Sequence, residues 1–391
     1  MKQIPLTIFD ETLRDGEQQV GIFFDRSTKE DLARLIAQTG VHHIALMPAI
    51  HTTEAQIVRQ LTKGNLRSII TASTMMGRNH IDRSFACGVE TIILFNAVSD
   101  RLLSLRDPLV LQAYKPDSAT IKQVRDRMLE RVLSHVQYAA SKGLKICFAA
   151  EDASRADFDF LVECISKLQP YIEHFILCDT VGILNPEDTK LWVRNLIEFT
   201  HNRTPLTVHF HNDRGLALEN TMQAVLAGAM GVSGTFGGIG ERAGNVALEQ
   251  VLSGLKLRYG WQIPGINYDA LTEVTDYLSQ KGFRANAPYS SASLRYETGI
   301  HVDSLCSDRS SYYLFTHGEP EVWYGKFSGA SSFEYLFEYC LKQPQAPAKY
   351  QEFREQIKNL AIAQKRSFSQ TEVLQLLGYS KSKCDKIYQF A

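Results

Sequence analysis

The chain has 391 residues, and its 42 lysines and arginines nearly balance 43 aspartates and glutamates, which leaves a formal net charge of −1. This balance argues against a protein that binds nucleic acid or a charged membrane surface. Apolar residues make up 44% of the chain and charged residues 22%, which is typical of a globular protein with a sizeable core.

The N-terminus and the cysteines indicate a cytoplasmic protein. No apolar run is long enough for a transmembrane helix, and residues 1–8 lead into a strand-like segment without the features of a signal peptide. The seven cysteines are scattered and form no CxxC pair. We therefore expect reduced thiols, no membrane association and a cytoplasmic location.

Short β-branched runs alternate with longer amphipathic stretches up to about residue 260. Eight strands within about 260 residues, each followed by a helix, match the number of strands and the chain length that are typical of a TIM (β/α)8 barrel. An open doubly wound sheet is the alternative, but no GxGxxG motif follows the first strand. The predicted strands are 6–10, 42–46, 68–73, 90–96, 145–149, 174–178, 206–210 and 231–236, and the helices include 27–38, 121–141, 157–168, 186–200, 217–226 and 242–257.

The alternation stops after the barrel, and we place a domain boundary near residue 265. Residues 1–265 would form the catalytic barrel, and 266–391 a smaller, mostly helical region with a loop-rich stretch at 285–307. Two helix starts carry good capping residues, namely Ser27 and Asn185, the latter followed by Pro186.

Polar residues gather at the carboxyl ends of the predicted strands, which form the active-site face of such a barrel. The pair His209 and His211 has the i, i+2 spacing that points two side chains to one side of a strand. Two imidazoles with the carboxylate of Asp15, from the first strand's end, would suit a divalent ion such as Mg, Mn, Co or Zn. Such an ion can bind a 2-oxo acid and polarise its carbonyl.

Three motifs resemble those of one family. They are Asp10-Glu-Thr-Leu-Arg-Asp-Gly-Glu-Gln18, His209-Phe-His-Asn-Asp213 and Gly238-Ile-Gly-Glu-Arg-Ala-Gly-Asn245, and Thr298-Gly-Ile-His301 and Gly325-Lys-Phe-Ser-Gly329 look like downstream signatures of the same group. The chain is similar to the Claisen-condensing members of the DRE-TIM metallolyase family, the isopropylmalate, homocitrate and citramalate synthases. This resemblance implies that acetyl-CoA loses a methyl proton, adds to a 2-oxo acid and is hydrolysed to CoA.

The resemblance also implies roles for individual residues. Asp15, His209 and His211 would hold the metal, with Asn245 in or near its shell. Catalysis would involve Arg14, which stabilises the developing oxyanion, together with His301 as base or relay, Tyr312 and Glu151. The substrate would contact Gln18, Thr180, Asn96, Ala45 and Cys147. The family further implies a homodimer, in which His301 serves its own or the neighbouring subunit.

Departures from the family pattern bear on the substrate. Ala45 stands where the family usually carries a glutamate, and Cys147 stands at the position we aligned with the arginine of homocitrate synthases. Without that arginine a second carboxylate would lack a bidentate partner. We therefore expect a hydrophobic 2-oxo acid, with phenylpyruvate giving 2-benzylmalate as the first choice, and we expect Cys147→Arg to shift activity towards diacids.

Other readings stay open at this point. The smaller 2-oxoisovalerate, or a homocitrate synthase activity, would use the same machinery, as would a lyase of the same superfamily. A non-catalytic metabolite-binding protein is a further alternative, motivated by the acid lost at Ala45. We also expect no leucine-type regulatory domain, because residues 350–391 are too few to form one.

Overall fold

The computed structural model describes residues 2–107, 117–314 and 318–379. Eight parallel strands close into a barrel in chain order, and the last strand pairs with the first through the register Thr7 to Gly231 and Asp10 to Gly234. The predicted TIM barrel is thus confirmed. Its strands are β2 (Thr7–Asp10), β3 (His43–Leu46), β4 (Ile69–Met75), β5 (Thr91–Ala97), β6 (Lys145–Glu151), β7 (His174–Asp179), β8 (Leu206–Phe210) and β9 (Gly231–Gly234).

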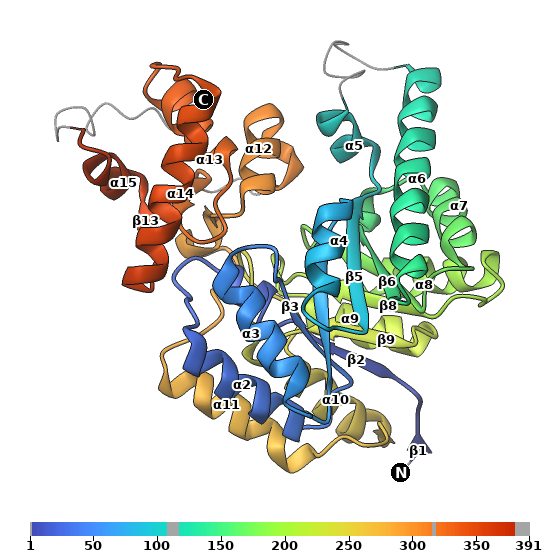
Figure 1. Ribbon diagram of the computed structural model, residues 1–391. Coiled ribbons are helices and arrows are strands. Elements are labelled where there is room, and N and C mark those ends of the chain that lie inside the picture. Colours follow the sequence, from blue (N-terminus) through green and yellow to red (C-terminus); the bar gives the residue numbers. More distant parts are fainter. Residues whose placement is uncertain (1, 108–116, 315–317, 380–391) are drawn as a thin grey trace.

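Helices surround the barrel and bury their apolar faces against the outside of the sheet (Figure 1). On α2, for example, Leu32, Ala33 and Ile36 are spaced to face one side, and all three are buried. The helices are α2 (Arg26–Gln38), α3 (Thr52–Lys63), α4 (Arg78–Phe85), α5 (Asp100–Arg106), α6 (Ser118–Ser141), α7 (Phe158–Leu168), α8 (Pro186–Phe199), α9 (Ala217–Ala227) and α10 (Leu248–Tyr259).

Two predicted helix starts need correction. Asp25, not Ser27, caps α2, because its carboxylate accepts the backbone N–H of Thr28. The last barrel helix begins at Leu248 rather than at residue 242, since the backbone before it pairs with other strand ends, Asn245 with His211 and Ala247 with Thr235. Asn185 does cap α8, as predicted.

The interior of the barrel contains its own small apolar cluster, separate from the larger core between sheet and helices. Its side chains come from β2, β3, β5, β6 and β7, and β7 contributes two of them, so the interior of the barrel is a packed core. The cluster consists of Phe9, Ala45, Ile93, Cys147, Ile176 and Cys178, with Ala149 packed against it.

The chain beyond the barrel first adds α11 (Leu271–Gln280), which packs against α2, and then forms what we call the C-terminal unit, residues 285–314 and 318–379. Figure 1 shows its helices (orange to red) above the barrel, where α12 contacts α5. The unit is mostly helical as predicted, with a small unpredicted sheet. Its elements are α12 (Gly299–Ser307), α13 (Ala330–Glu334), a π-helix (Tyr335–Cys340), α14 (Pro347–Gln364), α15 (Gln370–Leu376), β11 (Arg295–Tyr296), β12 (Glu321–Tyr324) and β13 (Phe368–Ser369).

A two-stranded sheet of β1 (Lys2–Gln3) and β10 (Trp261–Gln262) lies beside the barrel. Within the three described ranges, no helix has both the length and the apolar character needed to cross a membrane.

Candidate active site

Three predicted metal ligands meet at the carboxyl ends of the strands. Asp15 lies on α1 (Asp15–Gln18), just beyond β2, while His209 and His211 lie at the end of β8. The Nε2 atoms of the two imidazoles lie 3.7 and 3.9 Å from Oδ2 of Asp15. One ligand atom from each residue falls within 4.8 Å of the others, and all three residues are buried.

The chemistry of this group fits a divalent cation. Burial lowers the pKa of His209 and His211, which keeps both imidazoles neutral, as a metal ligand must be. Ser233 Oγ lies 3.0 Å from Nδ1 of His209, and this contact orients the ring so that Nε2 faces Asp15. Nδ1 of His211 and Oδ1 of Asn245 are buried and find no hydrogen-bond partner within the described part of the chain.

The carboxylate of Asp15 stays ionised although it is buried. Burial by itself would raise its pKa, but the positive charge of Arg14 and the hydrogen bond from Asn245 outweigh that effect and hold the pKa below its usual value. Arg14 donates to Oδ2 at 2.9 Å, and Asn245 Nδ2 donates to Oδ1 at 2.8 Å. A Cβ at Gly240 would lie 2.1 Å from that amide nitrogen, so the turn needs glycine to let Asn245 approach.

A small inner pocket of about 130 Å³ lies against this group. It includes most of the predicted site residues, together with apolar side chains from several strands. It is lined by Arg14, Asp15, Gln18, Met47, Ser73, Ile93, Phe95, Ala149, Glu151, Cys178, Thr180, His209, His211, Glu241, Thr298, Ile300 and His301.

Two predicted substrate contacts are wrong in this structure. Ala45 and Cys147 are fully buried in the apolar cluster below the pocket and do not line it. Met47 and Ala149, two positions further along the same strands, line the pocket in their place. Alternate residues of a strand share a face, so the direction was predicted correctly but the depth in the barrel was not.

Two other substrate predictions have different outcomes. Asn96 lines the outer cavity described below rather than the inner pocket, and its amide is occupied: Oδ1 accepts from Arg131 at 2.6 Å and Nδ2 donates to the backbone of Ala97. Thr180 does line the inner pocket. Its hydroxyl oxygen accepts the N–H of Asp152 at 2.8 Å, and a hydroxyl in that role retains a proton that it can donate.

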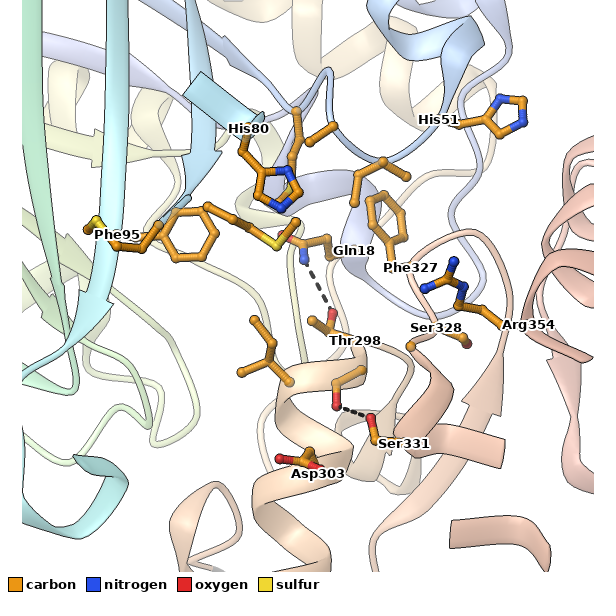
Figure 2. Close-up of a pocket in the computed structure, with 18 of the residues that line it drawn as sticks. Gln18, His51, His80, Phe95, Thr298, Asp303, Phe327, Ser328, Ser331 and Arg354 are labelled. Carbon is orange, nitrogen blue, oxygen red and sulfur yellow. Dashed lines mark hydrogen bonds between the residues drawn. The ribbon is translucent and has the colours of Figure 1, made fainter. Parts of the chain in front are cut away.

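His301 lies on α12, not in a loop as predicted, and it lines the inner pocket of its own chain. Its Nδ1 lies 3.2 Å from Oε1 of Glu241, a residue that our sequence reading did not single out. The same oxygen accepts a hydrogen bond from Thr298, whose hydroxyl accepts from Gln18 at 3.2 Å (Figure 2). The only sequence signal for Glu241 was its place in the glycine-rich motif after the last strand.

Glu151 and Tyr312 belong to a three-residue cluster completed by Arg106, which was also missed. Arg106 donates to both carboxylate oxygens of Glu151, at 2.7 and 3.1 Å, and to the hydroxyl of Tyr312 at 2.8 Å. The hydroxyl of Tyr312 donates to Glu151. Burial by itself would raise the pKa of Glu151, but the charge and hydrogen bonds of Arg106, together with the hydrogen bond from Tyr312, have a larger opposite effect, and the pKa falls to about 2. Glu151 is therefore a carboxylate at neutral pH and has no proton to donate.

An outer cavity of about 970 Å³ adjoins the inner pocket, and both are lined by Gln18, Met47 and Thr298, among others. It lies between the barrel loops and the C-terminal unit, where Figure 2 shows Phe327 and Arg354 on one side and Phe95 and His80 on the other. Several of its lining residues are basic, including His51, Arg83, Arg131, Arg354 and Lys358.

With this geometry in place, comparison with known proteins is informative. A model of the HMGL-like family matches residues 5–278. The chain belongs to this family. Homocitrate synthase AksA of Methanothermobacter thermautotrophicus is 32% identical over 335 residues, which cover 83% of this chain and 81% of that protein. (R)-citramalate synthase CimA of Methanocaldococcus jannaschii is 32% identical over 84% of this chain and 65% of its own length.

2-Isopropylmalate synthase 2 of Caldanaerobacter subterraneus subsp. tengcongensis is 30% identical, with 85% of this chain and 84% of that protein covered. These relatives confirm the predicted place of this HMGL-like chain in the Claisen-condensing branch of the DRE-TIM proteins. An HMG-CoA lyase from Brucella melitensis shares the fold, with a TM-score of 0.56 at 18% identity over 72% of this chain and 99% of that one.

Proposed function

We propose that this protein condenses acetyl-CoA with a hydrophobic 2-oxo acid and releases CoA. The observation that carries the proposal is the group of Asp15, His209 and His211 in a small pocket that also contains His301 and adjoins a much larger cavity. A divalent ion in this group would bind the carboxylate and keto oxygens of the 2-oxo acid and polarise its carbonyl. The similarity to homocitrate, citramalate and isopropylmalate synthases supports the same type of reaction.

The residues of the chain would carry the proton transfers. His301, whose Nδ1 lies 3.2 Å from a carboxylate oxygen of Glu241, takes a proton from the acetyl methyl group. The resulting carbon nucleophile adds to the keto carbon, and the guanidinium of Arg14 stabilises the negative charge that develops on the oxygen. Water then hydrolyses the thioester, so that acetyl-CoA, 2-oxo acid and water become a 2-alkylmalate and CoA. Thr180 can donate its hydroxyl proton to the substrate carboxylate.

The inner pocket favours an apolar substrate side chain. Around the metal group the walls are formed largely by Met47, Ile93, Phe95, Ala149 and Ile300. Among the described lining residues the only arginine or lysine is Arg14, which the proposed reaction already uses at the keto oxygen. A second carboxylate would lose its hydration without gaining a cationic partner. We therefore propose phenylpyruvate as substrate, giving 2-benzylmalate, with 2-oxoisovalerate as the smaller alternative.

The outer cavity would accommodate acetyl-CoA. Its volume of about 970 Å³ is large enough for a nucleotide-containing thioester, and its basic side chains would attract phosphates. Burial lowers the pKa of Lys358, one of these basic side chains.

A thiol-release assay with acetyl-CoA, added Mg or Mn and a panel of 2-oxo acids tests the proposal. We expect the highest kcat/KM with phenylpyruvate, followed by 2-oxoisovalerate. Fastest turnover of 2-oxoglutarate would contradict the hydrophobic assignment and favour a homocitrate synthase. Absence of CoA release with every acid, together with CoA-ester cleavage in the reverse direction, would favour a lyase. The homodimer and the cytoplasmic location stay predictions, and sedimentation velocity checks the first.

A further inference from the structure

We propose that Lys326 is a positioning residue: it anchors the C-terminal unit, and with it the helix that carries His301, to the barrel segment that carries Asp15. The kinetic part of this proposal rests on the proposed function, whereas the anchoring itself does not.

Lys326 belongs to a buried cluster of four charges, which we call the ion quartet: Glu17, Lys29, Glu54 and Lys326. Lys29 lies 2.6 Å from Glu17 and 2.5 Å from Glu54. Lys326 lies 2.9 Å from Glu17 and is also bonded to Glu54. All four side chains are at most 5% exposed. The quartet is electrically neutral, and each ammonium group bonds both carboxylates.

The quartet joins two parts of the fold. Glu17 on α1, Lys29 on α2 and Glu54 on α3 belong to the barrel, while Lys326 follows β12 in the C-terminal unit. A buried charge that loses its partner is strongly destabilising, whereas the intact group holds its members in one geometry. If the C-terminal unit moved away from the barrel, the charges of the quartet would become exposed to solvent or would stay buried without a partner. Lys326 is the only member of the quartet that belongs to this unit.

A short path leads from Lys326 to His301. The carbonyl of Phe327, the next residue, accepts the backbone N–H of Gly299 at 3.3 Å, and Gly299 is the first residue of α12. Gly299 also packs closely on Gly329, since a Cβ on Gly299 would lie 2.6 Å from the Cα of Gly329. Ser331 donates to the carbonyl of Gly299 at 2.9 Å, a hydrogen bond drawn in Figure 2. The start of α12 is thus held by the segment that Lys326 anchors.

On the barrel side, the quartet is joined through α1 to the metal group and the inner pocket. The short helix α1 places Glu17 in the quartet, Asp15 in the metal group and Gln18 in the inner pocket. Gln18 in turn donates to Thr298, the residue before α12. Displacement of the C-terminal unit would therefore change the distance between His301 and the metal group directly.

Lys29 supplies a matched control. Lys326→Met and Lys29→Met each remove one buried ammonium group from the same two carboxylates, but of these two lysines only Lys326 belongs to the C-terminal unit. If the quartet serves stability alone, the two variants should behave alike. If Lys326 positions α12, only Lys326→Met should change the exchange of the α12 backbone and the turnover of the folded enzyme.

The experiment compares both variants with the wild type by hydrogen–deuterium exchange over residues 299–307 and by steady-state kinetics, at a temperature where thermal unfolding shows each to be folded. For Lys326→Met we expect faster exchange of α12 and a kcat about 10- to 100-fold lower, because a displacement near 1 Å at the reacting groups has that effect. For Lys29→Met we expect α12 exchange and kcat close to wild type. Equal changes in both variants, or wild-type exchange and kcat in Lys326→Met, would overturn the proposal.

The double variant Lys326→Met with Glu54→Gln guards against loss of folding. It removes one charge of each sign, so the buried group is neutral again and the melting temperature should recover. We expect kcat to stay low and α12 exchange to stay fast, because the anchor is still missing. If kcat and the exchange of α12 returned to wild-type values together with the melting temperature, Lys326 would act through stability only. Because exchange needs no substrate, a wild type that turned over no 2-oxo acid would refute the proposed function and leave the anchoring decided by exchange.

Discussion

The imidazole of His301 stacks on the ring of Tyr312, with centroids 4.0 Å apart and planes inclined by 30°. Tyr312 is itself held by its hydrogen bonds with Glu151 and Arg106. Glu241 lies at the Nδ1 side of the imidazole. The imidazole therefore has a ring against its face and a carboxylate near its Nδ1 edge, which leaves Nε2 as the nitrogen available to a substrate.

Removal of the base should affect turnover far more than removal of its support. We expect His301→Ala to lower kcat by about 10²- to 10⁴-fold, the usual contribution of a general base. Tyr312→Phe keeps the stacking but loses the hydroxyl, so we expect a loss of about 10-fold or less from this hydrogen-bonded group. CoA release at saturating substrates measures both. A His301→Ala enzyme with more than a tenth of wild-type kcat would contradict the assignment.

Metal affinity should depend on a hydrogen bond behind the metal group. Ser233 orients His209 through a contact of 3.0 Å, so Ser233→Ala should weaken Mn binding about 10- to 100-fold, as loss of such a supporting group usually does. Isothermal titration of metal-stripped protein measures the affinity. Thr207→Val is the control, because Thr207 makes a similar 2.8 Å contact with His174, which lies outside the metal group. Equal weakening in both variants would contradict the prediction.

The fold and the metal group could be predicted because both depend on local periodicity. Alternating strand and helix patterns determined the barrel, and the i, i+2 spacing placed His209 and His211 on one face. The i, i+2 periodicity does not show how far along a strand a residue lies, and so it does not distinguish a residue in the pocket from one buried below it. Strand β6 extends to Glu151, two residues beyond its predicted end, and this extension places Ala149 in the pocket and Cys147 below it.

Long-range partners were equally invisible to local patterns. Arg106 reaches Glu151 and Tyr312 across 45 and 206 residues, and nothing around it in the sequence indicates this contact. Lys326 was visible only as part of a glycine-rich motif. Its partners Glu17 and Glu54 lie 309 and 272 residues away, so the buried ion quartet could be recognised only in three dimensions.

Stability should fall in mild acid because of histidines buried in the strands. Burial lowers the pKa of His43 to about 3 and that of His174 to about 4. The unfolded chain binds these protons near pH 6.5 while the folded protein does not, so their contribution to stability is complete above pH 6.5 and is lost as the pH falls towards the folded values. Between pH 6.5 and pH 5, each of these two histidines should lower the free energy of unfolding by about 1.5 kcal/mol.

Urea unfolding of the wild type and of His43→Gln at these two pH values isolates one proton site. We expect the stability of the variant to depend less on pH, by about 1.5 kcal/mol over the interval. His43 stacks on Phe9 and contacts Thr71, so the variant should also be less stable at pH 7. Identical pH dependence in the two proteins would show that the pKa of His43 is the same in the folded and the unfolded state, and would contradict the prediction.

Substrate preference should respond to Ala149 and not to Cys147. Ala149 lines the inner pocket of about 130 Å³, so Ala149→Leu should exclude bulky side chains and lower kcat/KM for phenylpyruvate by about 10- to 200-fold relative to pyruvate, the range that small changes in an apolar pocket produce. Cys147 is enclosed by apolar residues, including Phe9 and Ile93. An arginine there would be a buried charge without a partner, and we expect Cys147→Arg to misfold rather than to gain activity on diacids. A folded Cys147→Arg enzyme that accepted 2-oxoglutarate would restore position 147 to the substrate pocket.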